Sequence, residues 1–198
     1  MKAKMFVFYL LAVLLGGCVL SLHPLYTDKE LIFDEKLLGS WDLDEHKWEF
    51  KKAGEKKSYE LIVTDEGGKG EFAAHLVKID KMLFLDLYPK GPDFKASNYL
   101  KLHLLPAHTF LRIEQIEPTL KIRAMNPEKM DDMLEKDPNL VKHEVVEGRI
   151  VLTASPKELQ KFMKKYADVK DLFGEPGELK RPELEDPNKP KAIDPNKP

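Results

Sequence analysis

Short segments in which apolar and charged residues alternate recur along the middle of the chain and constrain its fold more than any other feature. In two of them, Trp48 and Phe50 are separated by Glu49, and Leu120 and Ile122 by a lysine. The segments that predict strands are residues 48–51, 59–64, 72–79, 82–88, 100–104, 111–114 and 120–123. A period of two is typical of strands with one buried face. The sequence contains no glycine-rich crossover motif of a parallel α/β sheet. We therefore expect an all-β, mainly antiparallel barrel or sandwich.

Turn signals separate these segments. Asp65-Glu66-Gly67-Gly68 predicts a hairpin loop and Asp80-Lys81 a tight turn, because such residues tolerate a positive φ. Residues 82–88 differ from the other segments because they are apolar on both faces. Residues 143–153 predict a final hairpin, with its turn at Glu147-Gly148.

Two helices are expected to interrupt or close this meander. Asn126-Pro127 can cap a short helix that ends near Glu135. Ser155-Pro156-Lys157-Glu158 has the pattern of a capping box, with proline at the first helical position. The helix that follows should bury one apolar stripe, formed by Leu159, Phe162, Met163 and Tyr166.

A helical turn leads into a G-x-W motif at the first predicted strand of the barrel. Asp34 begins the turn, two leucines follow, and Gly39-Ser40-Trp41 ends it. A short turn that leads into G-x-W resembles the opening motif of lipocalins and the wider calycin family. This resemblance covers roughly residues 34–170. It implies an up-and-down barrel of about eight or more strands, with a short inserted helix and a C-terminal helix.

The same resemblance implies a structural plug. In that family the tryptophan fills the closed end of the barrel, and an arginine from a late strand covers it. Trp41 would be the plug, and Arg149 is our choice for the arginine because it opens the last predicted strand. Arg123 is the second choice. The alternative is that Trp41 is an ordinary core aromatic and that Arg112 and Arg123 point outward, as the alternation of their strands indicates.

The N-terminal segment predicts export. A basic Met1-Lys2-Ala3-Lys4 precedes an apolar run that ends in Leu15-Gly16-Gly17-Cys18, and Cys18 is the only cysteine. A basic start, an apolar core and small residues before a cut site are typical of a secretory signal peptide. The arrangement resembles the lipobox of bacterial lipoproteins. That resemblance implies removal of residues 1–17, attachment of lipid (including palmitate) to Cys18, and a location at a cell membrane, facing the periplasm or the cell exterior.

Two other fates of this segment stay open. The weakly polar run from Met5 to Leu22 spans 18 residues and could serve as an uncleaved membrane anchor. Cleavage without lipidation would give a secreted product. Because Val19, and not an aspartate, follows Cys18, the lipoprotein reading resembles outer-membrane sorting in enterobacteria.

The predicted domain organisation has four parts. Residues 1–17 form the signal peptide, 18–33 the lipidated N-terminus and tether, 34–173 the barrel domain, and 174–198 a disordered tail rich in proline and charge. The tether is apolar, so Leu22, Leu25 and Tyr26 should pack on the domain. Its Leu22-His23-Pro24-Leu25-Tyr26-Thr27 run is similar to one in a group of uncharacterised bacterial lipoproteins. The tail is expected to be solvated, or to dock on a partner or the cell wall.

No constellation in the sequence points to catalysis. The six histidines are scattered, and no metal-ligand spacing or nucleophile motif occurs, so we predict no catalytic residues, no metal and no cofactor. The net charge of −2 makes nucleic acid an unexpected partner. Two functions remain, and an enzyme is a distant third. The barrel could bind a small apolar ligand, or a filled barrel could serve as a non-catalytic structural and interaction lipoprotein of the cell envelope.

Overall fold

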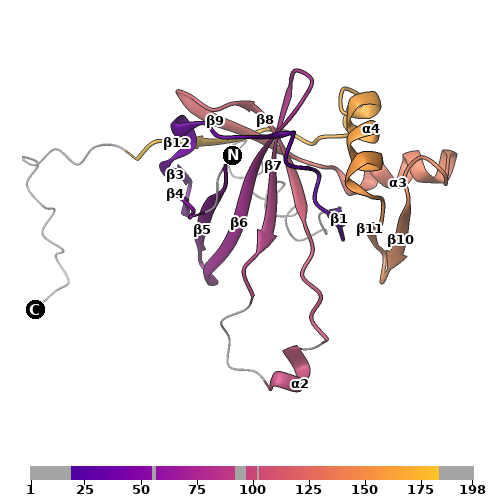
Figure 1. Ribbon diagram of the computed structural model, residues 1–198, viewed down its shortest axis with the longest axis horizontal. Helices are drawn as coiled ribbons and strands as arrows, with labels where there is room; N and C mark the ends of the chain where they lie inside the picture. The colour runs from indigo at the N-terminus through magenta and orange to yellow at the C-terminus, as the bar shows by residue number, and fades with distance from the viewer. Residues whose placement is uncertain (1–18, 55–56, 92–96, 102, 183–198) are drawn as a thin grey trace, which may run out of the picture.

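An eight-stranded antiparallel barrel with a second layer packed on one side makes up the fold (Figure 1). The computed structural model describes residues 19–54, 57–91, 97–101 and 103–182. The second layer contains two helices and a small three-stranded sheet. The predicted all-β, lipocalin-like barrel is therefore confirmed.

The barrel is a meander that one late strand completes. Its strands are β3 (Gly39–Leu43), β4 (His46–Lys52), β5 (Tyr59–Asp65), β6 (Gly68–Ile79), β7 (Met82–Pro89), β8 (Thr109–Gln115), β9 (Thr119–Ala124) and β12 (Gly177–Lys180). Each strand from β3 to β9 pairs with the next along the chain, and β12 lies between β3 and β9. The barrel closes through β12.

The short turns explain the register of the long strands. Asp65 pairs with Gly68, and Ile79 with Met82, so two residues suffice for each connection. Gly68 has a φ of 124° and Asp80 a φ of 54°. Glycine and aspartate tolerate this left-handed region better than most residues, which is why these turn signals were informative.

The remaining elements surround the barrel. They are β1 (Leu20–Ser21), β2 (Leu31–Ile32), the 3-10 helix η1 (Glu35–Leu37), α2 (Asn98–Lys101), α3 (Pro127–Lys136), β10 (His143–Val146), β11 (Arg149–Leu152) and α4 (Pro156–Tyr166). The small sheet has the order β1-β11-β10, and β2 pairs with β6. Strand β1 runs parallel to β11, with Leu20 opposite Val151.

Both predicted helices form, and each begins directly after its predicted capping residue, α3 after Asn126 and α4 after Ser155. The Asn126 side chain accepts hydrogen bonds from the first turn of α3, which buries Met130 and Leu134. Ser155 and Glu158 form the capping box of α4. The predicted apolar stripe of α4 is confirmed, with Leu159, Phe162 and Met163 buried and Tyr166 packed at the edge.

Two hydrophobic cores share the wall of the barrel. One fills the barrel, and the other lies between the barrel and the second layer. Strand β7 serves both: Leu85 and Leu87 belong to the barrel core, and Phe84 to the outer one. This double burial explains why residues 82–88 are apolar on both faces.

The predicted tether, residues 18–33, is part of the fold from residue 19 onward. Val19 is 4% exposed, β1 and β2 both belong to sheets, and Leu25 is fully buried. Tyr26 packs against the outer core, whereas Leu22 is exposed. The domain therefore begins before residue 34. The sequence did not reveal this because β1 and β2 have only two residues each, too few to show an alternating pattern.

The boundary at residue 174 is corrected as well. The predicted tail begins before β12, and Leu179 of β12 is fully buried in the barrel core. Proline and charged residues dominate the composition around this strand, so the sequence there indicates a disordered tail and not a strand. Residues 183–198 lie outside the described residues, so the rest of the tail stays a prediction.

The strand predicted at residues 100–104 is wrong. Asn98–Lys101 form α2 in the long β7–β8 connection, and Leu100 and Leu104 are exposed. The hairpin predicted at residues 143–153 does form, but in the three-stranded sheet and not in the barrel.

Candidate functional site

The barrel interior is the first place where a ligand site could lie, and large side chains fill it. Aromatic and aliphatic residues from every barrel strand meet there. The buried members are Leu37, Trp41, Phe50, Tyr59, Leu61, Ala74, Leu76, Leu85, Leu87, Ile113, Ile116, Leu120, Ile122 and Leu179. A barrel of eight strands is just wide enough for its side chains to fill the lumen. This interior has the composition of a packed core.

Trp41 belongs to the barrel core and is bonded to η1. The indole is fully buried, and its Nε1 donates a hydrogen bond to the Leu37 carbonyl at 2.9 Å. The guanidinium carbon of Arg181 lies 3.7 Å from the centroid of the ring. Arg181 also donates to the carbonyl oxygens of Lys36 at 2.6 Å and Leu38 at 2.7 Å. The arginine therefore covers the tryptophan and caps the carbonyls of η1.

The residue over Trp41 is Arg181 and not the predicted Arg149. Arg149 is exposed at the start of β11, in the three-stranded sheet. Arg181 directly follows β12, which is the true last strand of the barrel. The choice of Arg149 followed from placing the last strand at residues 149–153. Arg123, the second choice, donates to Glu114 and to the Gly174 carbonyl.

Tyr59 contacts the segment that leads into η1. Its hydroxyl accepts a hydrogen bond from the Asp34 amide at 2.7 Å and donates to the Asp34 carbonyl at 3.1 Å. Burial raises the pKa of Tyr59 to about 12, since ionisation would place a charge in the core. Its ring stacks on Phe33 with centroids 4.6 Å apart. These contacts join the entry to η1 to the barrel wall.

A buried carboxylate holds the N-terminal segment on the outer face of the barrel. Asp86 is fully buried on β7. It accepts a hydrogen bond from the Leu25 amide at 2.7 Å and one from His108 Nδ1 at 2.6 Å. A carboxylate inside a protein needs such partners to offset its lost hydration. Nearby, the ring centroids of Tyr26 and His75 lie 4.5 Å apart, and the Tyr26 hydroxyl is hydrogen-bonded to the His75 ring.

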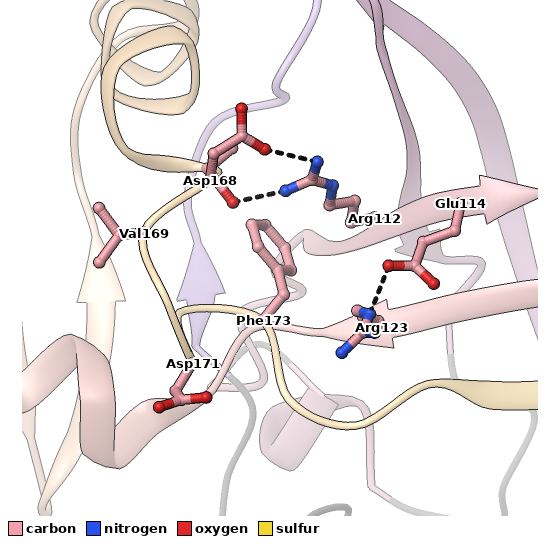
Figure 2. A pocket seen from close by; sticks show the side chains of 8 residues that line it. Arg112, Glu114, Arg123, Asp168, Val169, Asp171 and Phe173 are labelled. Carbon is pink, nitrogen blue, oxygen red and sulfur yellow. Dashed lines mark hydrogen bonds and ion pairs between the residues drawn. The ribbon is translucent and has the colours of Figure 1, made fainter.

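The hollow shown in Figure 2 lies where the segment after α4 crosses β8 and β9. Its volume is about 190 Å³. Arg112 donates to Asp168 Oδ1 at 2.7 Å and to the Ala167 carbonyl, and its guanidinium lies 5.9 Å from the Phe173 ring centroid. Arg123 donates to Glu114 at 2.6 Å. Both arginines donate hydrogen bonds to acceptors of the protein itself. Through the bonds to Ala167, Asp168 and Gly174, they hold the segment after α4 on the barrel.

A larger hollow of about 490 Å³ lies between α4 and the connection from α3 to β10. Its lining combines Phe162, Tyr166 and Leu140 with Lys161 and Lys165. The position is outside the barrel, on the second layer. The hollow thus combines apolar side chains with charged ones.

The residues described here show no sign of a metal centre. No group of three or more His, Cys, Asp or Glu side chains among them could hold a metal ion. His75 and His108 each contact a neighbouring side chain instead. Cys18 and the predicted signal peptide lie outside the described residues. No helix within the described ranges is long and apolar enough to cross a membrane.

Comparisons with protein-family models, with curated proteins and with solved structures found no match for this chain. The function is therefore inferred from the geometry of the barrel and from the N-terminal sequence.

The sequence analysis did not identify two residues that are important in the structure. Arg181 stands in a segment whose prolines indicated a tail, and only the short alternation around Leu179 could have revealed the strand before it. Asp86 was detectable, because it is a lone carboxylate in a run that is apolar on both faces. Such a residue must find a buried partner.

Proposed function

We propose that this chain is a lipoprotein of the cell envelope, anchored to a membrane through Cys18. Its barrel would act as a filled, non-catalytic structural and interaction module. The packed barrel core beneath the Trp41–Arg181 pair is the observation that supports this choice over a ligand carrier. Both hollows described above lie outside that core.

The anchor is supported by the sequence before residue 19 and by the fold after it. The run Leu15-Gly16-Gly17-Cys18 resembles a lipobox. Val19, the next residue, is buried and leads directly into β1. A lipid on Cys18 would thus have almost no tether between it and the folded domain. Two acyl chains at ~0.8 kcal/mol per buried methylene are enough for stable attachment.

Replacement of Cys18 tests the anchor. Cys18→Ala should abolish incorporation of an alkyne-labelled fatty acid and leave a precursor whose mass still includes residues 1–17. Cys18→Ser serves as a second variant of nearly the same size. If Cys18→Ala is still cut after Gly17 and still partitions with membranes, the lipoprotein assignment is wrong.

The alternative is a barrel that carries a small apolar ligand. It requires the core side chains to part, because they occupy the lumen. Native mass spectrometry of the purified full-length protein separates the two functions. We expect the mass of the lipidated chain alone, whereas a stoichiometric additional small molecule would favour the ligand carrier.

An interaction module needs a partner surface, and the hollow beside α4 is the best candidate. A photo-crosslinking residue at Lys161, which lines this hollow, should capture an envelope protein in cells. The same residue at Lys121, on the barrel strand β9, is the matched control. Equal capture from both positions would argue against a specific surface beside α4.

A further inference from the structure

The exposed large hydrophobic side chains are not scattered over the described surface. They gather in three segments: the residue after β1, the β7–β8 connection, and the end of β10. The members are Leu22, Tyr99, Leu100, Leu104, Leu105, Val145 and Val146. Single exposed apolar residues are normal on a protein surface, but clusters mark contact sites. Leu105 is 75% exposed and Tyr99 74% exposed, so the fold itself gives them little cover.

Strand β1 joins the three segments. Ser21 exchanges two backbone hydrogen bonds with His108, at 2.9 and 2.8 Å, and His108 ends the β7–β8 connection. On its other side, β1 pairs with β11, whose hairpin partner β10 carries Val145 and Val146. Leu22 follows β1 directly. The first described residues of the chain are therefore the common base of the whole apolar group.

The register shows from which side the chain enters. Leu20 lies opposite Val151 in a parallel pair, so β1 begins on the side of β11 that is nearer to the hairpin turn at Glu147-Gly148. In Figure 1, that turn and α2 both project toward the lower part of the view, away from α4. The side from which the chain enters β1 is thus the side on which Val145 and Val146 are exposed.

We propose that the exposed apolar side chains of the β7–β8 connection and of the end of β10 form a lipid-contacting face, which seats the domain on the bilayer that holds its anchor. This inference rests on the proposed lipoprotein function, because the anchor brings the face to the membrane. Cys18 immediately precedes the base of the face. A lipid chain on Cys18 would emerge beside the apolar side chains, so that one bilayer could take up both.

The charges nearby indicate apolar contact instead of attraction to anionic lipid. Arg149 is exposed beside Val146, but Glu144 and Glu147 are exposed on the same hairpin. Tyrosine, as at position 99, suits the boundary between lipid and water. Vesicles of zwitterionic phosphatidylcholine are therefore the appropriate probe.

Site-specific fluorescence on the full-length, lipidated chain tests the face. Acylated Cys18 offers no thiol, so an environment-sensitive dye can be attached at Leu105→Cys, Val146→Cys or the control Lys81→Cys. Lys81 is exposed and directly precedes β7, whereas the β7–β8 connection follows that strand. The eight residues of β7 separate these ends by about 26 Å at ~3.3 Å per residue.

We expect dyes at Leu105 and Val146 to shift to shorter wavelength on phosphatidylcholine vesicles and to be quenched by lipids with brominated acyl chains. The dye at Lys81 should keep its spectrum in water. Replacing Leu104 and Leu105 together by serine should reduce quenching at Val146, while Lys81→Ser should not. Both leucines are exposed, so these changes spare the core.

Vesicle flotation separates failure of this inference from failure of the proposed function. A chain that floats with vesicles but shows equal quenching at Leu105 and Lys81 is anchored without a lipid-contacting face, and overturns the inference alone. A chain that does not float overturns both. A dye at Leu105 that only an envelope protein shields, with no quenching by lipid, would assign the face to a protein partner and reject the bilayer.

Discussion

The guanidinium of Arg181 stacks on the Trp41 ring, 3.7 Å from its centroid, and so joins the last described strand to the first strand of the barrel. Lys180 is the only residue of β12 in register with β3, opposite Asp42, among the described pairs. Arg181 reinforces this short seam through its hydrogen bonds to the Lys36 and Leu38 carbonyls. Arg181 therefore links the buried Trp41 to the strand pair that closes the barrel.

Arg181→Ala should lower the free energy of unfolding by about 2 kcal/mol. It removes a stacked cation, worth ~0.5–2 kcal/mol, and hydrogen bonds from a charged donor to backbone carbonyls. Chemical denaturation followed by tryptophan fluorescence measures the loss. Arg149→Ala is the matched control, and since Arg149 is exposed we expect a change within ~0.5 kcal/mol.

Arg181→Lys should give an intermediate loss, because lysine keeps the charge but lacks the planar fork that reaches two carbonyls at once. If Arg181→Ala and Arg149→Ala destabilise the protein equally, the cation over Trp41 has no structural role.

Removal of β12 should open the barrel. A chain that ends at Pro176 loses the buried Leu179, the pairing of β12 with β9, and Arg181. The cost should reach ~5 kcal/mol, comparable with the whole stability of a typical domain. A chain that ends at Pro182 keeps these contacts and is the control. Thermal unfolding by circular dichroism compares them, and equal midpoints would contradict the closing role of β12.

A strand that is buried on one face has apolar residues at every second position. This pattern can be read within each strand, and for that reason the sequence predicted the barrel. Capping residues such as Asn126 and Ser155 located both helices for a similar reason: their hydrogen bonds are local. Trp41 was recognised through a short motif. In each case the information lies within a few residues of the feature that it predicts.

Arg181 and the second layer depend on contacts that are distant in sequence. Strand β12 has four residues, so its alternation is too short to distinguish it from a tail, and its place between β3 and β9 follows from barrel closure. Leu100 and Leu104 alternate with polar residues as a strand would, yet they lie in an exposed connection. Period alone does not show whether a face is covered, because covering depends on the rest of the fold.

Glu158 should make the stability of the protein depend on acid pH. Hydrogen bonds from Ser155 and Lys142 lower the pKa of Glu158 from its ordinary value of 4.5 to about 2. The ionised form is favoured by folding, so its stabilising effect is complete above about pH 4.5 and is lost as pH falls toward 2. Glu158→Gln should be less stable than the natural chain at pH 6, and the difference should shrink between these two pH values.

Denaturation midpoints measured across this pH range test the capping box. Ser155→Ala, which removes the main cause of the shift, should reduce the same pH dependence. A constant difference between Glu158→Gln and the natural chain from pH 6 to pH 2 would show that the carboxylate charge does not contribute.

Asp86 should be essential for holding the N-terminal segment on the barrel. Asp86→Ala leaves the Leu25 amide and His108 Nδ1 buried without their acceptor, which should cost about 3–5 kcal/mol. Asp86→Asn keeps one acceptor oxygen and should cost less. The double variant Asp86→Ala with His108→Phe removes both members of the pair, so its loss should be smaller than the sum of the single losses.

Hydrogen exchange locates the effect of Asp86. In Asp86→Ala the Leu25 amide should lose most of its protection, whereas amides of β3 and β4, which lie on the opposite side of the barrel from β7, should keep theirs. Since Leu25 follows β1 closely, loosening at this point would also free the segment nearest the proposed lipid anchor. Unchanged protection at Leu25, together with a loss below ~1 kcal/mol, would show that the buried carboxylate does not fasten the N-terminal segment.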